Sequence, residues 1–166
     1  TADALYAQFA GKGLSIIVGL GGGSVMDMTK LTAQCVANNI DPRKIVSGEA
    51  VAESRGLPMI LAPTTSGTGS EVSSIFVLTD GEKKVFKNSP YYYSDISIID
   101  PALTVSMPPT VTATTGLDAL SHAIEGMMST NASPLSDILC LGGIELVGAY
   151  LRQAVANGKD LEARYY

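Results

Sequence analysis

Features that nucleic-acid-binding and membrane-spanning proteins need are scarce in this sequence. Its 166 residues include no tryptophan, two cysteines and a single histidine, and eleven Lys and Arg stand against sixteen Asp and Glu. The formal net charge is −5 and the pI is near 4.7. Because proteins bind nucleic acid mainly through basic side chains that displace counterions from phosphates, we expect no nucleic-acid partner.

Long apolar runs and a signal-peptide pattern are missing as well. The longest apolar stretches, such as Ile16–Leu20 and Met59–Ala62, are far shorter than the roughly 20 residues of a membrane helix. We therefore expect no membrane partner and a cytoplasmic location. Cys35 and Cys140 both lie on apolar stripes of predicted helices, so we expect free thiols and no disulfide.

The chain is nevertheless apolar enough to fold. Its apolar content of 46% and mean hydropathy of +0.24 allow one domain, or one domain with part of a second. It starts without methionine in a predicted short helix at 2–9, and it stops at Tyr166 just after another helix begins. We therefore expect a fragment.

Three short apolar runs predict a parallel sheet. Leu14–Leu20, Pro58–Ala62 and Ile96–Ile99 each read as a strand buried on both faces. After the first strand, Ser24 is expected to be the N-cap of a helix that ends at Asn38-Asn39, with Asp27 completing a capping box.

The second half changes character twice. Val72–Thr79 and Lys83–Lys87 flank Asp80-Gly81, which predicts a β-hairpin. Pro108-Pro109 then interrupts the chain, and we place the domain boundary there, between residues 1–108 and 109–166. Leu117, Leu120, Ile124 and Met127 form one apolar helical stripe after this boundary, and a second helix is predicted from Ser133-Pro134 to Ala156, in which Gly142-Gly143 marks close helix packing.

Two loops have the composition of anion-binding loops. Gly19-x-Gly21-x-x-Ser24 follows the first strand and opens a helix, although it lacks the third glycine of the dinucleotide fingerprint. The second loop, Thr64–Glu71, interleaves hydroxyl side chains with glycines, which suits phosphate and ribose oxygens. A tight strand-to-helix turn and a solvated surface loop are the respective alternatives. Lys84 is either a cofactor contact or a solvated edge charge.

Asp118 and His122 are four residues apart on a predicted helix. This spacing puts a carboxylate and an imidazole on one side of the helix, where both can bind one divalent metal. A surface hydrogen bond between the two is the alternative. Because His122 is the only histidine, the chain alone does not complete a typical four-ligand site.

Taken together, these segments resemble the iron-containing (group III) alcohol dehydrogenase family over nearly the whole chain. The residues that carry the resemblance are Gly21-Gly22-Gly23-Ser24-x-x-Asp27 with Lys30, the loop from Pro63 to Glu71, Asp100-Pro101, Pro108-Pro109, and the stretch from Thr115 to Glu125. The resemblance implies an α/β fold, a Rossmann-like parallel-sheet nucleotide domain followed by the start of an all-helical domain, as in dehydroquinate synthase.

The resemblance also implies roles for single residues. The implied cofactors are NAD or NADP, and Fe²⁺ or Zn²⁺, with Asp118 and His122 as two metal ligands and catalytic residues. The family's other two ligands and its proton-relay histidine lie later than this chain. Ser66 stands where alanine is common in the family, and we expect no effect on the site. The implied cofactor contacts are Gly22, Gly23, Ser24, Asp27, Thr64, Thr65, Thr68, Lys84 and Leu103.

The implied activity is that of an alcohol dehydrogenase of class EC 1.1.1. The metal would act as a Lewis acid on the oxygen of a small alcohol or aldehyde, while hydride passes between substrate and nicotinamide. A homo-oligomer is left open. The alternative is a non-catalytic nucleotide-binding or assembly module derived from that family.

Overall fold

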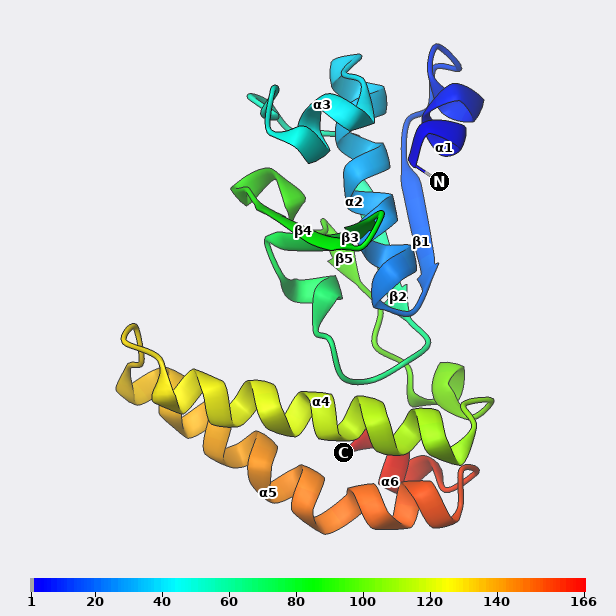
Figure 1. Cartoon of the computed structure of the whole chain (residues 1–166). Coiled ribbons are helices and arrows are strands. Elements are labelled where there is room, and N and C mark those ends of the chain that lie inside the picture. Colours follow the sequence, from blue (N-terminus) through cyan, green and yellow to red (C-terminus); the bar gives the residue numbers. More distant parts are fainter. Residues whose placement is uncertain (1) are drawn as a thin grey trace. The chain divides into compact units, whose positions relative to one another are not determined.

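The computed structural model describes residues 2–166, which divide into two compact units (Figure 1). Unit 1 comprises the chain up to Pro63 together with Ser70–Ile99, and unit 2 comprises Thr64–Gly69 together with Asp100–Tyr166. The loop Thr64–Gly69 therefore belongs to the helical unit, although both of its neighbours in sequence belong to the sheet unit. The boundary after residue 108 stays a prediction.

A three-stranded parallel sheet forms the centre of unit 1, as the apolar runs predict. It contains β1 (Ile17–Gly21), β2 (Met59–Pro63) and β5 (Ile96–Ser97) in the order β1-β2-β5. Ile17 pairs with Met59, and Ile60 pairs with Ile96. Helix α2 (Gly23–Asn38) follows β1 directly and ends at Asn39, whose left-handed backbone has a φ of 53°.

The prediction that the strands are buried on both faces is wrong for β1 and β5. Val18 and Leu20 are 60% and 59% exposed, and Ile96 is 53% exposed. Successive side chains of a strand point to opposite faces. Gly19 is buried, and a Cβ built on it would lie 2.6 Å from Thr29 Oγ1 of α2, so α2 covers that face of β1. No element of residues 2–166 buries the opposite side of this strand.

The core of unit 1 forms on two sides of α2. One cluster joins α2 to the hairpin of β3 (Ile75–Asp80) and β4 (Lys83–Asn88), and the other joins α2 to β2. The hairpin turn consists of Gly81-Glu82, one residue later than predicted, because Asp80 pairs with Lys83. Helices α1 (Ala2–Phe9) and α3 (Pro42–Ser47) and the 3₁₀ turns Ser70–Val72 and Pro90–Tyr92 complete the unit. The buried apolar residues of the clusters are Leu31, Cys35, Ile45, Phe76 and Tyr92, and Met26, Ala33, Met59 and Leu61.

Unit 2 is built on an antiparallel helix pair (Figure 1). It contains a 3₁₀ turn (Pro101–Thr104), α4 (Pro109–Met128), α5 (Pro134–Ala156) and α6 (Leu161–Tyr165). The predicted bounds of α5 are confirmed, and Ser133 caps it in a capping box with Ser136. Of the two glycines predicted to mark close packing, a Cβ on Gly143 would lie 3.8 Å from Ala123 Cβ of α4, whereas Gly142 has no neighbour within 4 Å.

The long helix α5 is apolar over most of its length, although it contains no long uninterrupted run of apolar residues. Its 23 residues include an 18-residue window with a mean hydropathy of 1.4, which by length and composition alone suffices to cross a membrane. A single helix of this kind is weak evidence, because helices of soluble proteins pass the same test. The absence of a membrane partner therefore stays a prediction. Both cysteines are free, as expected, and burial raises the pKa of Cys35 to about 12.

Candidate functional site

Asp118 and His122 lie on the same side of α4, as their spacing predicts. The distance from His122 Nε2 to Asp118 Oδ1 is 4.0 Å, and the side chains are 52% and 44% exposed. Because bonds from a divalent metal such as Zn²⁺ to nitrogen or oxygen are about 2.0–2.2 Å long, two ligands of one tetrahedral ion are about 3.4 Å apart. The observed separation is somewhat longer, and a small rotation of either exposed side chain would bring the pair to the distance that one shared cation needs.

This pair is not a complete metal site. Within residues 2–166, no group of three or more His, Cys, Asp or Glu side chains is placed to hold a metal ion. The nearest further candidate along α4, Glu125, is exposed one turn beyond His122. The described part of the chain thus offers one carboxylate and one imidazole, and a bound metal would need further ligands.

The loop Thr64–Gly69 is seated on the same helix. A Cβ built on Gly67 would lie 2.4 Å from the backbone oxygen of Thr115 and 3.0 Å from its Cβ. Thr115 precedes Asp118 by about one helical turn. Within unit 2, the structure therefore brings the threonine loop and the Asp118–His122 pair onto one helix. In the loop, Thr64 and Thr65 are half-buried and Thr68 is exposed.

The glycine loop of unit 1 ends in a helix start that no side chain caps. The N-cap of α2 is Gly22, in extended backbone, and it has no side-chain hydrogen bond. The prediction that Ser24 is the N-cap is therefore wrong, and Ser24 lies in the first helical turn next to Gly23. A glycine-rich helix start without an acidic or capping side chain suits a phosphate, because its N–H groups and the helix dipole face outward.

Asp27 does not form a capping box. It is 8% exposed, and its Oδ1 accepts a hydrogen bond of 2.6 Å from Ser70 Oγ, while its Oδ2 accepts one of 3.0 Å from the backbone N–H of Val77. Both carboxylate oxygens thus bind residues far along the chain. Asp27 joins the start of α2 to the segment that follows the threonine loop, which favours a positioning role over direct cofactor contact.

Lys30 was not among the predicted site residues, although it belongs to the motif. Its side chain is fully buried, and its Nζ donates to Ser73 O, Ser73 Oγ and Ile75 O over 3.0, 3.1 and 2.7 Å. Burial lowers the pKa of Lys30 to about 8, opposed by the charges of Asp27 and Glu71. The signal in the sequence is a lysine on the buried side of an amphipathic helix, between Met26 and Ala33.

Two further predicted contacts lie in separate elements. Lys84 is exposed on β4, where its Nζ donates a hydrogen bond of 2.8 Å to Thr79 Oγ1 on the paired strand. Leu103 is half-buried in the 3₁₀ turn before α4. Unit 1 therefore contains Gly22, Gly23, Ser24, Asp27 and Lys84, and unit 2 contains Thr64, Thr65, Thr68, Leu103, Asp118 and His122.

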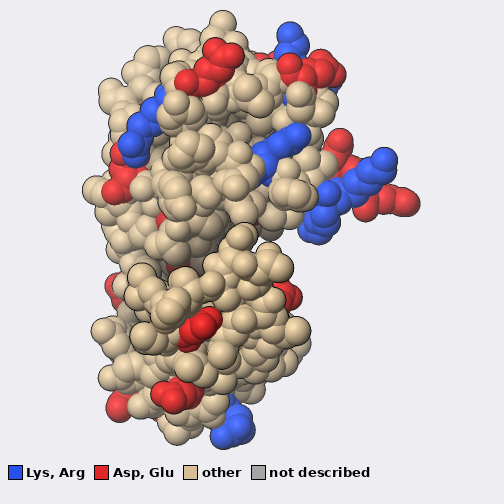
Figure 2. All heavy atoms as spheres, turned by 90° about the vertical axis from the view of Figure 1, so that its left-hand side faces the viewer, with Lys and Arg blue, Asp and Glu red and all other residues tan. Residues whose placement is uncertain are grey.

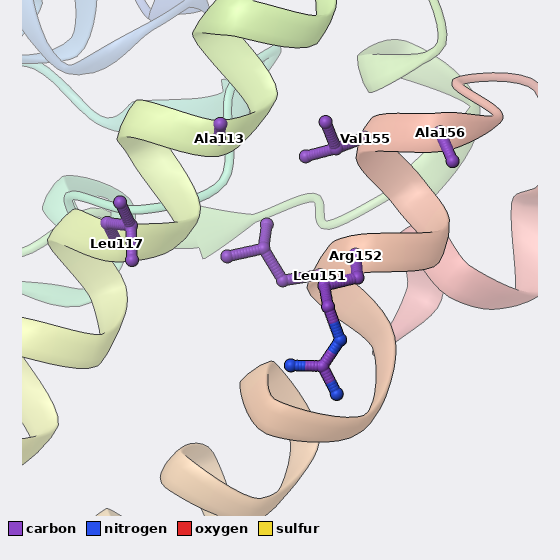
Figure 3. Close-up of a pocket in the computed structure, with 6 residues that line it drawn as sticks. All are labelled: Ala113, Leu117, Leu151, Arg152, Val155 and Ala156. Carbon is purple, nitrogen blue, oxygen red and sulfur yellow. The ribbon is translucent and has the colours of Figure 1, made fainter.

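An apolar hollow of about 340 Å³ between α4 and α5 contains none of these predicted residues (Figure 3). Its one charged lining residue, Arg152, donates to the carbonyl oxygen of Gly148 within its own helix. The hollow therefore offers packing space and no obvious chemistry. The lining residues are Ala113, Leu117, Leu151, Arg152, Val155 and Ala156.

Acidic and basic side chains are mixed on the face of the molecule in Figure 2. Figure 2 shows one face of the molecule, on which acidic and basic side chains are interspersed among uncharged residues without a continuous basic area. The absence of a nucleic-acid partner stays a prediction.

Comparison with known families supports the family resemblance inferred from the sequence motifs. Residues 1–101 match the family model described as iron-containing alcohol dehydrogenase, and residues 112–166 match the model described as the C-terminal part of the Fe-containing alcohol dehydrogenase family. Together the two models cover nearly the whole chain.

Curated relatives carry names of the same kind. The chain is 48% identical over 151 residues to long-chain-alcohol dehydrogenase 1 of Geobacillus thermodenitrificans, covering 90% of this chain and 38% of the relative. It is 46% identical over 156 residues to sulfoacetaldehyde reductase of Bilophila wadsworthia, covering 92% and 40%. The chain thus spans about 40% of the length of these relatives.

Solved structures agree in fold. Sulfoacetaldehyde reductase from Bifidobacterium kashiwanohense, in complex with NAD⁺, superposes with a TM-score of 0.93 at 37% identity, covering 98% of this chain and 44% of the other. An iron-containing alcohol dehydrogenase from Thermotoga maritima gives a TM-score of 0.88 at 33% identity, with the same coverage. The predicted arrangement of a Rossmann-like sheet followed by helices is confirmed by this similarity.

Proposed function

This chain belongs to the iron-containing alcohol dehydrogenase family, and on that premise we propose that it provides the cofactor loops and part of the metal site of an NAD-dependent dehydrogenase for a small alcohol or aldehyde. One observation carries the proposal. The Asp118–His122 pair, 4.0 Å apart, lies on α4, and the loop that contains Thr64 and Thr65 contacts the same helix of unit 2 at Thr115 through Gly67.

The residues present fit two groups, the metal that the family description names and the NAD⁺ bound in a similar solved structure. Asp118 and His122 would hold the cation, because their donor atoms suit Fe²⁺ or Zn²⁺ and they lie close together on one side of α4. The uncapped N–H groups at Gly22 and Gly23 would bind the pyrophosphate, and the hydroxyls of Thr64, Thr65 and Thr68 would bind oxygens of the cofactor. When bound, the cation supplies Lewis-acid chemistry to a substrate oxygen, and the nicotinamide supplies the hydride chemistry.

The protein residues would then act by orientation and charge. The Asp118 carboxylate and the His122 imidazole would together keep a cation at one place on the α4 surface. The half-buried threonines fix one end of the cofactor, and Gly22 and Gly23 fix its phosphates. Asp27 and Lys30 act at a distance, because they tie α2 to the chain segment that leaves the threonine loop.

The comparisons also favour one choice of cofactor, metal and substrate over the others. NAD is preferred over NADP because the similar structure from Bifidobacterium kashiwanohense is an NAD⁺ complex, and iron is preferred over zinc because of the family's description. The names of the relatives, a long-chain-alcohol dehydrogenase and a sulfoacetaldehyde reductase, favour a primary alcohol and the matching aldehyde. A cytoplasmic location and self-association remain further expectations.

The test is a pair of alanine substitutions in the full natural protein. Asp118→Ala should lower the metal content after purification and lower the rate of NADH-dependent aldehyde reduction by about a hundredfold or more, because a metal ligand is removed. Glu145→Ala, at an exposed carboxylate on the neighbouring helix α5, should leave both quantities at the wild-type level. Elemental analysis of the wild type identifies the cation. Full metal content and full activity in Asp118→Ala would contradict the proposal.

A further inference from the structure

The contact between Gly67 and α4 leaves no room for a side chain. The atoms that a Cβ at position 67 would meet are the carbonyl oxygen and carbon of Thr115, at 2.4 and 3.0 Å, together with its Cβ at 3.0 Å. Two of these atoms are helical backbone, which yields far less than the end of a flexible side chain. The loop can therefore approach α4 this closely only because residue 67 is glycine.

The helix is also held from another direction at the adjacent residue. A Cβ built on Gly116 would lie 2.3 Å from a methyl carbon of Leu151 on α5, so α4 and α5 are in close contact there. If a methyl group were added at position 67, the loop would move before α4 does, because Thr115 is part of the regular backbone of a 20-residue helix, whereas residues 64–69 form a loop. The contact therefore sets the distance between the loop backbone at Gly67 and the α4 backbone at Thr115.

Backbone conformation does not explain this glycine. Gly69, two residues later, has a φ of +62° and open space around its Cβ position, so a left-handed backbone accounts for that glycine. Gly67 shows the opposite combination, because its φ lies outside the left-handed range while its Cβ position is blocked. What position 67 requires is thus the absence of a side chain toward Thr115.

We propose that Gly67 is a positioning residue that sets the register between the cofactor loop and the metal-binding pair. Thr64, Thr65 and Thr68 lie on the loop, whereas Asp118 and His122 lie one and two turns beyond the contact at Thr115 on α4. A nicotinamide held by the loop is therefore kept at a fixed distance from a cation held by the helix, whatever motion the rest of the chain makes. This proposal rests on the proposed function and adds the device that aligns its two parts.

The first experiment compares Gly67→Ala with Ser66→Ala in the full natural protein, loaded with its metal. Ser66 is exposed, and its replacement removes one hydroxyl from the same loop while leaving Gly67 unchanged. Gly67→Ala should weaken NADH binding, measured by fluorescence titration, and should lower kcat, each by about tenfold or more, because a displacement near 1 Å can cost about a hundredfold in rate. Metal content should stay at the wild-type level, and Ser66→Ala should match the wild type throughout.

The isotope effect separates misalignment from simple loss of folded protein. With NADH deuterated at the transferred position, Gly67→Ala should show a larger primary isotope effect on kcat than the wild type, because a misplaced nicotinamide makes hydride transfer slower relative to the other steps. A variant that is merely part unfolded would keep the wild-type isotope effect and NADH affinity in its folded fraction. That result, or wild-type values in all measurements, would overturn the proposal.

A second measurement needs no variant and covers the case that Gly67→Ala does not fold. Hydrogen exchange of the wild type with and without NADH should show added protection both in the loop 64–69 and in residues 112–118 of α4. Protection of the loop alone would overturn the register proposal while leaving the proposed function intact. Failure of the wild type to bind NADH and metal at all would instead overturn the proposed function.

Discussion

Unit 1 and unit 2 bury their apolar residues to very different degrees. In unit 1 the described residues include two clusters of fully buried side chains, such as Leu31, Leu61 and Phe76, each 0% exposed. In unit 2 the buried apolar residues among those described are Met107, Ala154 and Ala163. Many large apolar side chains of α4 and α5 are exposed instead, including Leu117, Ile124, Met128, Leu135, Ile138 and Leu139.

The polar residues show the same contrast. Unit 1 buries Asp27 and Lys30 and gives each of them partners on another element. In unit 2 the buried Arg164 donates hydrogen bonds to Thr112 Oγ1 and to the carbonyl oxygen of Gly158. Its Nη2 has no hydrogen-bond partner within the described residues. The glycine loop therefore belongs to a unit with buried apolar clusters and paired buried charges. The Asp118–His122 pair instead lies on a helix pair whose apolar side chains are largely exposed, because no other element of residues 2–166 covers them.

The largest effect that this contrast predicts comes from removing buried volume. Leu61→Ala, in the central strand β2, should lower the free energy of unfolding by about 2–5 kcal/mol, because it removes buried methyl groups and leaves a cavity. Leu139→Ala on α5, where the leucine is 68% exposed, should change that free energy by less than about 0.5 kcal/mol.

Urea unfolding of the chain followed by circular dichroism measures both substitutions. Equal losses would show that α5 is covered in solution, and the contrast between the units would then be wrong.

Lys30 offers a pH-dependent test of the buried polar network. Lys30→Met leaves Ser73 O and Ile75 O without their donor, which should cost about 1–3 kcal/mol at pH 7. The pKa of Lys30 is lowered from 10.5 to about 8 in the folded chain. Between these values the unfolded chain binds the proton and the folded chain does not, so the stability contribution of Lys30 rises with pH.

The difference in unfolding free energy between wild type and Lys30→Met should therefore grow by about 1.4 kcal/mol per pH unit between pH 8 and pH 10.5. It should be flat below pH 7. Lys84→Met, at an exposed lysine on β4, serves as control and should show no such rise. A flat difference for Lys30→Met across pH 8–10 would show that burial does not lower the pKa of its ammonium group.

The elements with local signals could be predicted from the sequence. Ser133-Pro134 gives the start of α5 because capping involves neighbouring residues, and Asp80-Gly81 gives the hairpin to within one residue because the turn chemistry is local. The i,i+4 spacing likewise places Asp118 and His122 on one side of α4. Their role as metal ligands stays a prediction.

Contacts between distant segments could not be predicted in this way. Asp27 looks like a capping residue in sequence, and its actual partners, Ser70 and Val77, are 43 and 50 residues away. Nothing near Gly67 in sequence points to Thr115. Exposure of Val18 and Leu20 was missed for a related reason, since an apolar run shows that a strand can be buried on both faces, while burial itself depends on what packs against each face.

The smallest predicted changes in stability come from replacing two glycines of the α4–α5 helix pair by alanine, and the two changes have opposite signs. Alanine is favoured over glycine inside a helix by about 1 kcal/mol. Gly143→Ala should gain most of this, because the new Cβ would meet Ala123 Cβ at an ordinary 3.8 Å. At Gly116 the new Cβ would lie 2.3 Å from Leu151, and overpacking costs about 1–3 kcal/mol, so Gly116→Ala should be net destabilising. Thermal unfolding of both variants checks the signs, and a stabilising Gly116→Ala would mean that α4 and α5 pack loosely enough to separate, as the open apolar faces of unit 2 would allow.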